Sequence, residues 1–231
     1  MKLLAVDTSS NACSVAVQHG ECILQRHVVE ARAHTRLLLP MISGLLQEAA
    51  LEVADLDALV LGNGPGSFIG MRIGASVVQG LAFAAGRSII PVSSLAAIAA
   101  DVFSRHRAAQ VAVAQDARMQ QVYLGFYARG EADLPRAIGA EVICSAGEIE
   151  PPQPVRDAQW VTAGAGWQRY TDMVLAHHDV LTVSGADFPC ARHLLGIAVT
   201  KFEAGEAIPP EALQPAYLRT RVATPPATSA C

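Results

Sequence analysis

Aromatic residues make up only 5% of the 231-residue chain, and charged residues only 16%. Proteins that hold nucleic acid by themselves need a field of lysine and arginine, and single-strand binders also need aromatic rings for stacking. Here 17 basic residues are scattered along the sequence and face 21 acidic ones, which gives a formal charge of -4. We therefore expect any RNA to be held mainly by a partner.

Long apolar runs are also missing. The stretch at residues 75–85 is interrupted by Gln79 and falls short of the ~20 apolar residues that span a bilayer. Asp7 comes too early for a signal segment to form before it. The five cysteines contain no Cys-x-x-Cys pair, so neither a disulfide framework nor a zinc ribbon is indicated. The expectation is a cytoplasmic protein without a membrane segment.

The 52% share of hydrophobic residues is enough for a folded core. Apolar periodicity predicts the order βββαβαβα for the first hundred residues. The expected strands are 3–6, 13–17, 21–29, 56–61 and 88–92, and the expected helices are 34–51, a segment ending near 86, and 93 or 94 to 106. After residue 107 a shorter echo follows, with strands at 111–114, 122–128, 141–144 and 161–163 and a helix at 191–204.

Two domains are therefore predicted, at residues 1–108 and 109–219. Asp7 and Asp116 occupy equivalent turns in the two halves. A Pro-rich loop is expected at 151–154, and the tail at 220–231 is expected to be disordered because it is rich in proline and small polar residues.

The first turn carries Asp7, Thr8 and Ser9. Backbone N–H groups and hydroxyls in a tight turn can cradle phosphate oxygens, while a carboxylate can hold Mg²⁺. These three residues are therefore candidates for nucleotide or phosphate binding. They are equally consistent with a turn whose side chains only satisfy its own backbone.

Five glycines and a proline lie between residues 62 and 74, at a junction from strand to helix. One interpretation is an anion site at a helix N-terminus. The spacing matches neither a Walker loop nor a Rossmann fingerprint. The other interpretation is close packing, because Gly66, Gly70 and Gly74 recur every four residues on one helix face and admit a neighbouring backbone.

The helix at 34–51 is apolar around most of its circumference, and so is the helix that follows the glycines. Two such helices suggest a surface that another chain covers. The residues assigned to this interface are Leu38, Met41, Ile42, Leu45, Gly66, Gly70, Arg72, Ile73, Gly74, Val77, Val78 and Leu81.

Five segments, in this order, resemble the TsaB (YeaZ) family. They are Asp7-Thr8-Ser9, the run from Gly64 to Gly74, Val92-Ser93-Ser94-Leu95, Asp116-Ala117-Arg118 with Val122-Tyr123, and Pro215-Ala216-Tyr217-Leu218-Arg219. The resemblance covers about residues 1 to 219. It departs from the usual family form at Ile69 and Met71, where threonine and leucine are common.

This resemblance implies an α/β fold of the actin-like, sugar-kinase and Hsp70 (ASKHA) type, duplicated into two subdomains of which the second is degenerate. It also implies a role in forming N6-threonylcarbamoyladenosine at position 37 of tRNA. In that role the protein is an accessory subunit that binds and activates the catalytic paralogue TsaD, together with the ATPase TsaE. Pairing with TsaD is expected through the helices at roughly 34–51 and 70–86.

Catalytic residues and metal ligands are not expected. TsaD-like enzymes carry a His-x-x-x-His metal pair on the helix after the fifth strand, since residues four apart share a helix face. That helix begins here with Ser93-Ser94-Leu95, and no two of the seven histidines stand four apart. No cofactor is implied with certainty, and ATP or ADP at the subunit junction stays open.

Two alternatives remain at this stage. The chain could be an autonomous ATPase or small-molecule kinase that uses Asp7 for Mg²⁺ and the glycine-rich loop for phosphate. It could also form a homodimer through the same helices when its partner is missing.

Overall fold

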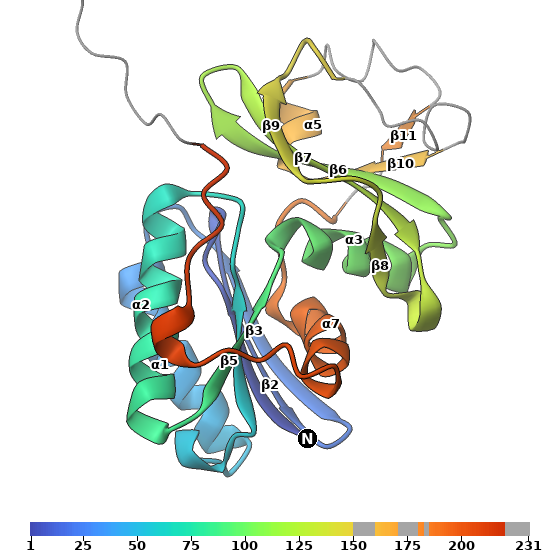
Figure 1. The fold of residues 1–231 in the computed structure, drawn as a ribbon. Coiled ribbons are helices and arrows are strands. Elements are labelled where there is room, and N and C mark those ends of the chain that lie inside the picture. Colours follow the sequence, from blue (N-terminus) through green and yellow to red (C-terminus); the bar gives the residue numbers. More distant parts are fainter. Residues whose placement is uncertain (150–159, 171–179, 183–184, 220–231) are drawn as a thin grey trace, which may run out of the picture.

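Two β-sheets, one from each half of the chain, organise the molecule (Figure 1). This computed structural model describes residues 1–149, 160–170, 180–182 and 185–219. The Pro-rich loop predicted at 151–154 and the tail predicted to be disordered at 220–231 both lie outside the described residues.

The first sheet has the strand order β3-β2-β1-β4-β5. Its strands are β1 (Lys2–Asp7), β2 (Ala12–His19), β3 (Cys22–Val29), β4 (Ala58–Gly62) and β5 (Ser88–Val92). β1, β2 and β3 are antiparallel neighbours, whereas β1, β4 and β5 are parallel neighbours. Residues 3–6 are apolar without alternation because β1 is central and buried on both faces.

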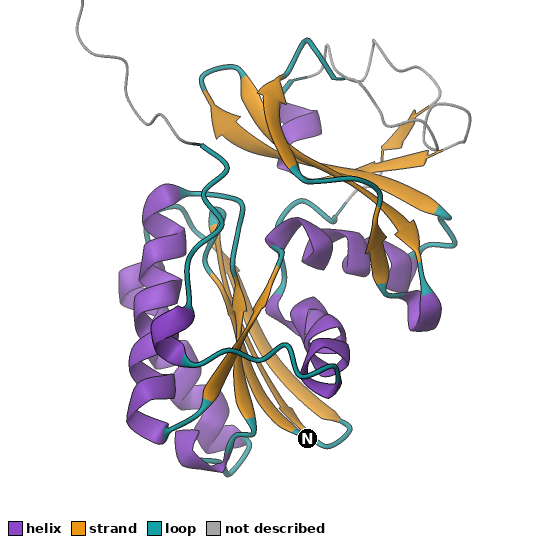
Figure 2. Ribbon diagram, viewed as in Figure 1, coloured by secondary structure: helices purple, strands orange, loops and turns teal. Residues whose placement is uncertain are grey.

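Helices cover both faces of this sheet (Figure 2). α1 (His34–Glu48) and α2 (Phe68–Ala85) pack on one face, where Leu45 and Val78 join Leu59 in one cluster. α7 (Ala191–Glu203) covers the other face, where Leu194 packs with Val60. A short 3-10 turn, η1 (Val53–Asp55), leads into β4. The helices predicted at 34–51, up to about 86, and 191–204 are confirmed to within a few residues.

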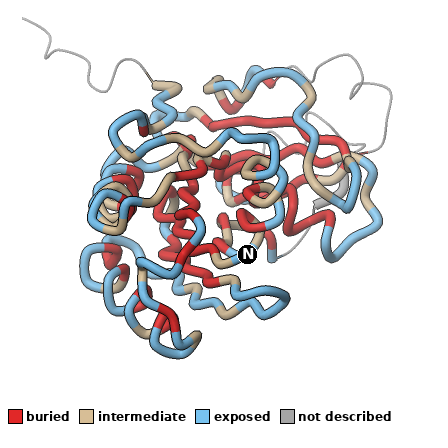
Figure 3. The backbone as a smooth tube through the Cα atoms, turned by 60° about the horizontal axis from the view of Figure 1, so that its bottom comes forward, coloured by how far each residue is buried: buried red, intermediate tan, exposed pale blue. Residues whose placement is uncertain are grey.

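Buried backbone runs through the interior of the molecule, and exposed backbone lies at its periphery (Figure 3). Among the described residues, α2 is the one helix whose length and hydropathy would let it cross a membrane. Core helices pass the same criterion. In this structure one side of α2, with Gly74, Val78 and Ala82, is buried against the first sheet.

The second sheet has the order β11-β10-β6-β7-β8, and β9 also pairs with β7. Its elements are β6 (Gln110–Arg118), β7 (Gln121–Arg129), β8 (Pro135–Ala137), β9 (Val142–Ser145), β10 (Trp160–Ala163) and β11 (Val180–Thr182), with α5 (Ala165–Arg169) after β10 and η2 (Glu131–Asp133) before β8. From the central strand, antiparallel neighbours lie on one side and parallel ones on the other, as in the first sheet. This repeat confirms the predicted duplication.

One predicted boundary was wrong. The strand predicted at 111–114 was expected to end there, but β6 continues to Arg118, with a register shift between Asp116 and Arg118. A β-bulge of this kind lets a strand continue while it redirects side chains. The polar character of these residues reflects their position at the end of a strand that faces a cavity, and not the loss of strand structure.

The last helix of each half packs on the sheet of the other half. α3 (Ser94–Arg105) follows β5 of the first sheet, yet its Ile98 and Val102 pack with Val111 and Val113 of the second sheet. α7 comes late in the second half and packs on the first sheet. Ten of the twelve residues of α3 are buried, which explains its alanine-rich sequence. The domain boundary at 108/109 stays a prediction. Each of the two ranges that it separates places one helix on the sheet of the other.

Asp101 joins α3 to α7. Its carboxylate lies 3.1 Å from His193 Nε2 on α7 and also pairs with Arg105. Burial by itself would raise the pKa of Asp101, but the hydrogen bond from His193 and the pairing with Arg105 outweigh it and lower that pKa below 3.8. The ionised form is therefore the one that the fold stabilises.

We predict that Asp101→Asn lowers the free energy of unfolding at neutral pH by about 1.5–3 kcal/mol, the usual contribution of a hydrogen bond to a charged group. Because the folded-state pKa is depressed, this contribution is present above the unfolded-state pKa and disappears as pH falls through the folded-state pKa. Urea denaturation at neutral pH and below pH 3.8 tests this.

Glu30→Gln is the control, because it removes the solvent-exposed pair between Glu30 and Arg36. It should cost at most ~1 kcal/mol. A loss in Asp101→Asn that is equal at both pH values would contradict the proposed charge effect.

Candidate functional site

The glycine-rich segment lies directly on the turn between β1 and β2. A Cβ atom at Gly66 would collide with the carbonyl oxygen of Ser9, and one at Gly70 with the carbonyl oxygen of Thr8. At Gly74 it would collide with Thr8 Oγ1. The four-residue spacing of these glycines therefore allows close packing, which was one of the two interpretations of the sequence. The surface it meets is the chain's own turn and not a partner helix, which corrects the interface prediction at these glycines.

Hydrogen bonds fix this contact. Ser67 N–H donates to Ser9 O at 2.6 Å, and Thr8 Oγ1 donates to Gly70 O at 2.7 Å. Ser67 also caps α2, because its Oγ accepts from Gly70 N–H at 3.3 Å. Gly64 has a φ of +86°, a conformation that favours glycine, and its N–H donates to Ser94 Oγ at 3.1 Å.

Asp7 is fully buried beneath this turn. Its carboxylate accepts hydrogen bonds from Ser9 N–H at 2.9 Å, Ser9 Oγ at 2.8 Å and Ser94 Oγ at 2.7 Å. Burial raises the pKa of Asp7 above 3.8, although these hydrogen bonds oppose the shift. The carboxylate thus ties β1 to the start of α3.

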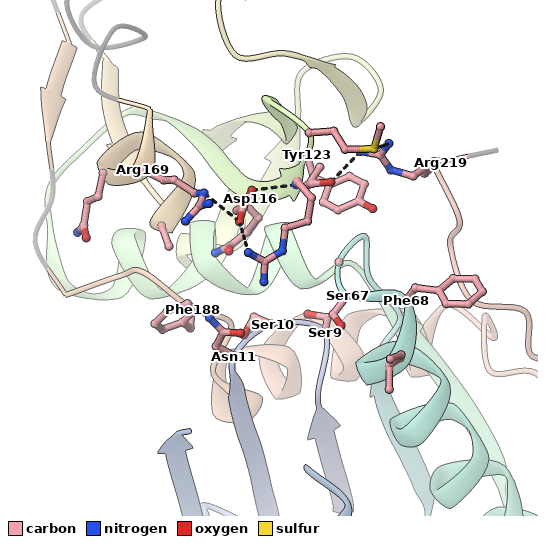
Figure 4. Close-up of a pocket in the computed structure, with 18 residues that line it drawn as sticks. Ser9, Ser10, Asn11, Ser67, Phe68, Asp116, Tyr123, Arg169, Phe188 and Arg219 are labelled. Atoms are coloured by element: carbon pink, nitrogen blue, oxygen red, sulfur yellow. Dashed lines mark hydrogen bonds and ion pairs between the residues drawn. The ribbon is translucent and has the colours of Figure 1, made fainter. Parts of the chain in front are cut away.

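A cavity of about 640 Å³ separates the two halves (Figure 4). Ser9, Ser10 and Ser67 line it from the first half, and Asp116 and Arg169 face them from the second. Of the three residues proposed from the sequence for phosphate binding, only Ser9 reaches this cavity. Asp7 and Thr8 are 0% and 1% exposed and point into the protein. A role of these three in nucleotide binding stays a prediction.

Asp116 organises the wall from the second half. Its carboxylate lies 3.2 Å from an Arg118 guanidinium nitrogen and 3.3 Å from Arg169 Nε, and it accepts from the Tyr170 hydroxyl at 2.9 Å. The Arg219 guanidinium donates to Ala117 O at 2.7 Å beside it. The sequence singled out Asp116 and Arg118 but missed Arg169, because only the fold brings α5 beside β6.

After η3 (Pro210–Ala212), residues 214–217 return to the glycine-rich loop. Asn63 Nδ2 donates to Gln214 O at 2.9 Å, and Arg72 Nε donates to the Tyr217 hydroxyl at 3.0 Å. The Arg72 guanidinium lies 3.5 Å above the centre of the Phe68 ring. The motif at 215–219 therefore holds the first turns of α2 in place.

The interface residues predicted from the sequence divide by burial. Five of them belong to the core under α1 and α2: Leu38, Met41, Ile42, Leu45 and Val78. Gly70 and Gly74 are buried too. Ile73, Val77 and Leu81 are partly buried, and Arg72 is exposed. At the buried positions this surface is the chain's own core, so the prediction that another chain covers them is wrong.

Exposed apolar residues on α2 were not predicted from the sequence. Ile69 is 70% exposed and Phe83 is 80% exposed. Gly80 is also exposed, and a Cβ atom there would meet nothing within 4 Å. A helical projection places these three opposite Gly74 and Val78, so the 3.6-residue period could have identified them once the inner side was known.

Comparison with known proteins gives consistent matches. A protein-family model described as "TsaD: tRNA N6-adenosine threonylcarbamoyltransferase" matches residues 28–216. The "tRNA threonylcarbamoyladenosine biosynthesis protein TsaB" of Escherichia coli (strain K12) is 34% identical over 223 residues, which cover 96% of each chain. The protein of the same name from Haemophilus influenzae is 38% identical over an alignment of 235 positions, which covers 96% of this chain and 95% of that one.

Solved structures agree. A structure described as "YeaZ from Pseudomonas aeruginosa" matches with a TM-score of 0.85 and 36% identity, covering 94% of this chain and 99% of that one. A second Pseudomonas aeruginosa structure, described as an uncharacterized protein with similarity to peptidase YEAZ, matches with a TM-score of 0.87 and 38% identity over the same shares. The predicted duplicated α/β fold is confirmed.

We predict opposite effects for two alanine substitutions within α2. Gly70→Ala should destabilise the protein by about 1–3 kcal/mol, since the new Cβ collides with the backbone of the β1–β2 turn. Gly80→Ala should stabilise it by about 0.5–1 kcal/mol, since the site is open and alanine favours helix. Urea denaturation measures both. Equal effects would contradict the close contact at Gly70.

A second prediction concerns the charge on Asp7. Because its folded-state pKa is raised, protonation favours the folded state, and this contribution is lost as pH rises through that pKa. Asp7→Asn keeps an acceptor oxygen but cannot ionise. The stability of the variant relative to wild type should therefore increase as pH rises above 3.8, as measured by denaturation across pH. Parallel pH profiles would contradict this.

Proposed function

The chain belongs to the TsaB family of tRNA threonylcarbamoyladenosine biosynthesis proteins, and from this membership we propose that it acts as a non-catalytic subunit. In this proposal it binds the transferase TsaD and supports its activity on tRNA together with the ATPase TsaE. The site of action is the cytoplasm, where tRNA is modified.

The observation that carries the proposal is the outer face of α2. Ile69, Ile73, Val77 and Gly80 follow one another at helical spacing on this face, and Phe83 lies beside them. Ile69 and Phe83 are among the most exposed large hydrophobic side chains of the described residues, at 70% and 80%. Exposed apolar side chains gathered on one side of a helix are typical of a surface that another protein covers.

A partner of related architecture suits this face. The family model that describes the transferase matches residues 28–216 of this chain, so the two proteins share an architecture over that range. Chains of related architecture can meet through equivalent helices about an approximate two-fold axis. The same geometry would allow a homodimer of this chain when TsaD is absent.

The arrangement of potential metal-ligating side chains supports the proposal that the partner TsaD carries out catalysis. Within the described part of the chain, no three His, Cys, Asp or Glu side chains gather as a metal site would require. The helix after β5 has serine, leucine and alanine where a TsaD-like metal pair would stand. With a formal charge of -4, this subunit has little electrostatic attraction for the phosphates of tRNA. In this proposal the other subunits of the complex make most of the tRNA contacts.

The alternative of an autonomous ATPase or kinase rests on Asp7 as the Mg²⁺ ligand. Asp7 already accepts three hydrogen bonds and has no exposed surface. A carboxylate in this state would have to break those bonds before it could hold a cation. No specific observation therefore favours this alternative.

We predict that Phe83→Glu and Gly80→Glu each weaken the pairing with TsaD. A charge placed in an apolar interface should weaken binding by about 2 kcal/mol or more, or roughly 30-fold. Because both sites are exposed, the fold should remain intact. Size-exclusion chromatography with TsaD measures pairing, and a reconstituted reaction with TsaD, TsaE and tRNA measures modification.

Val29→Glu is the matched control, because Val29 is 56% exposed and apolar but lies on the edge strand β3. It should pair like wild type. Variants on α2 that pair and support modification as well as this control would overturn the proposal.

A further inference from the structure

One edge of the first sheet has no strand beside it. β3 stands at the end of the strand order and runs for eight residues without a proline or a register shift. The other edge, β5, is covered, because Ile89 and Ile208 exchange two backbone hydrogen bonds of 2.8 Å. Sheets usually protect an edge by short length, proline, a bulge or a covering segment. Among the described residues, β3 therefore presents the longest open strand edge.

The backbone of β3 offers hydrogen-bonding groups along this edge. Glu30 N–H donates to Asn11 O at 3.1 Å, and the pairing of β3 with β2 continues from there without interruption. Since these groups alternate in direction along a strand, even-numbered residues of β3 face β2 and odd-numbered ones face outward. Within the described part of the chain, no hydrogen bond reaches the outward backbone groups. They belong to Ile23, Gln25, His27 and Val29.

Apolar side chains flank the open edge. Three large apolar side chains of β3 are exposed by 36% or more. They are Ile23, Val28 and Val29. All other described strands together carry one such residue, Val142. The arginine of β3, Arg26, lies over α1, where it pairs with Glu48 at 3.5 Å. It is therefore turned away from the edge that an incoming strand would approach.

A groove of about 800 Å³ runs beside the edge. The odd-numbered side chains of β3 form one wall, and α3, α7 and η2 form the others, with Leu134 and Phe188 adding apolar surface. A strand added to β3 would direct every second side chain to this side of the sheet. The groove has room for those side chains.

Opposite charges stand at the two ends of β3. Glu21 precedes the strand and Arg32 follows it, and both are exposed. Among the described residues neither joins an ion pair, whereas the nearby Arg26 and Glu30 do. A strand that runs antiparallel to β3 would begin near Arg32 and end near Glu21. Charge complementarity therefore favours an acidic residue at its start and a basic residue at its end.

We propose that β3 binds an extended segment of another protein as an added antiparallel strand. The segment has apolar side chains opposite both ends of β3, with an acidic residue before them and a basic residue after them. Its backbone hydrogen bonds provide affinity and its side chains provide specificity. A second copy of β3 suits the edge less well. Setting Ile23 against Val29 of that copy also sets two Arg26 side chains directly opposite each other, which is destabilising.

This surface is separate from the face proposed for TsaD. α2 packs against β1, β4 and β5, whereas α1 packs against β2 and β3. The proposal does not rest on the pairing with TsaD. Val29→Glu should accordingly weaken strand addition without changing that pairing.

The test uses the full chain and a labelled synthetic peptide of sequence EGSVVTTTVITK, which places threonine opposite the polar middle of β3. Fluorescence anisotropy measures binding, and amide hydrogen exchange followed by NMR locates it. The peptide should bind and slow the exchange of the odd-numbered amides of β3, since these face outward. The control peptide has its first and last residues exchanged. It should bind roughly threefold more weakly or worse at low salt, and added salt should reduce the difference.

Two variants separate the backbone of Gln25 from its side chain. Gln25→Pro and Gln25→Ala both remove the side chain, but only proline removes the outward N–H group, and the N–H groups that face β2 remain. Gln25→Pro should therefore bind the peptide roughly tenfold more weakly than Gln25→Ala. A thermal melt checks that both variants fold.

Several results would overturn the proposal. One is the absence of peptide binding, and another is binding that leaves the exchange of the odd-numbered amides unchanged. Equal affinity of the two variants, or of the two peptides, would also contradict it. Protection of the same amides that rises with protein concentration, without peptide, would assign the edge to a second copy instead. If Gln25→Pro does not fold, the exchange pattern and the two peptides still decide the question.

Discussion

Three glycines allow α2 to lie directly on the turn between β1 and β2, and much of the first half depends on this contact. Any side chain at Gly66, Gly70 or Gly74 would collide with the turn. Because the helix comes so close, Thr8 can donate to the Gly70 carbonyl and the turn closes over Asp7. The same contact decides which side of α2 is buried, and it thereby leaves the opposite apolar side exposed.

The two halves are held together by the chain that connects them and by two helices, each of which packs on the sheet of the other half. α3 packs on the second sheet and α7 on the first, and Asp101 links the two helices. Asp7 adds a second link through Ser94, at the start of α3. These ties bring the β1–β2 turn opposite Asp116, so that the cavity has one wall from each half. The partner face proposed on α2 and the cavity between the halves thus depend on one packing arrangement.

Several features could be predicted because their causes are local. The strands at the centre of the first sheet follow from uninterrupted apolar runs, and α1 and α7 follow from apolar residues at helical spacing. The helix predicted to begin at residue 93 or 94 does begin there, and the Ser93 hydroxyl accepts from the N–H groups of Leu95 and Ala96. The spacing of Gly66, Gly70 and Gly74 also indicated close packing. The sequence did not indicate the surface on which those glycines pack.

The amino-acid sequence by itself determined the duplicated α/β architecture, the family resemblance and the missing histidine pair, because these depend on residue types and on short-range periodicity. Only the tertiary structure decided which apolar residues of α2 remain exposed, that Asp7 is turned into the core, and that Arg169 and Arg118 share Asp116. Because α2 has apolar residues on more than one side, its sequence pattern does not distinguish the buried side from the exposed side. Contacts between residues far apart in the chain make that choice, since burial depends on which surfaces finally meet.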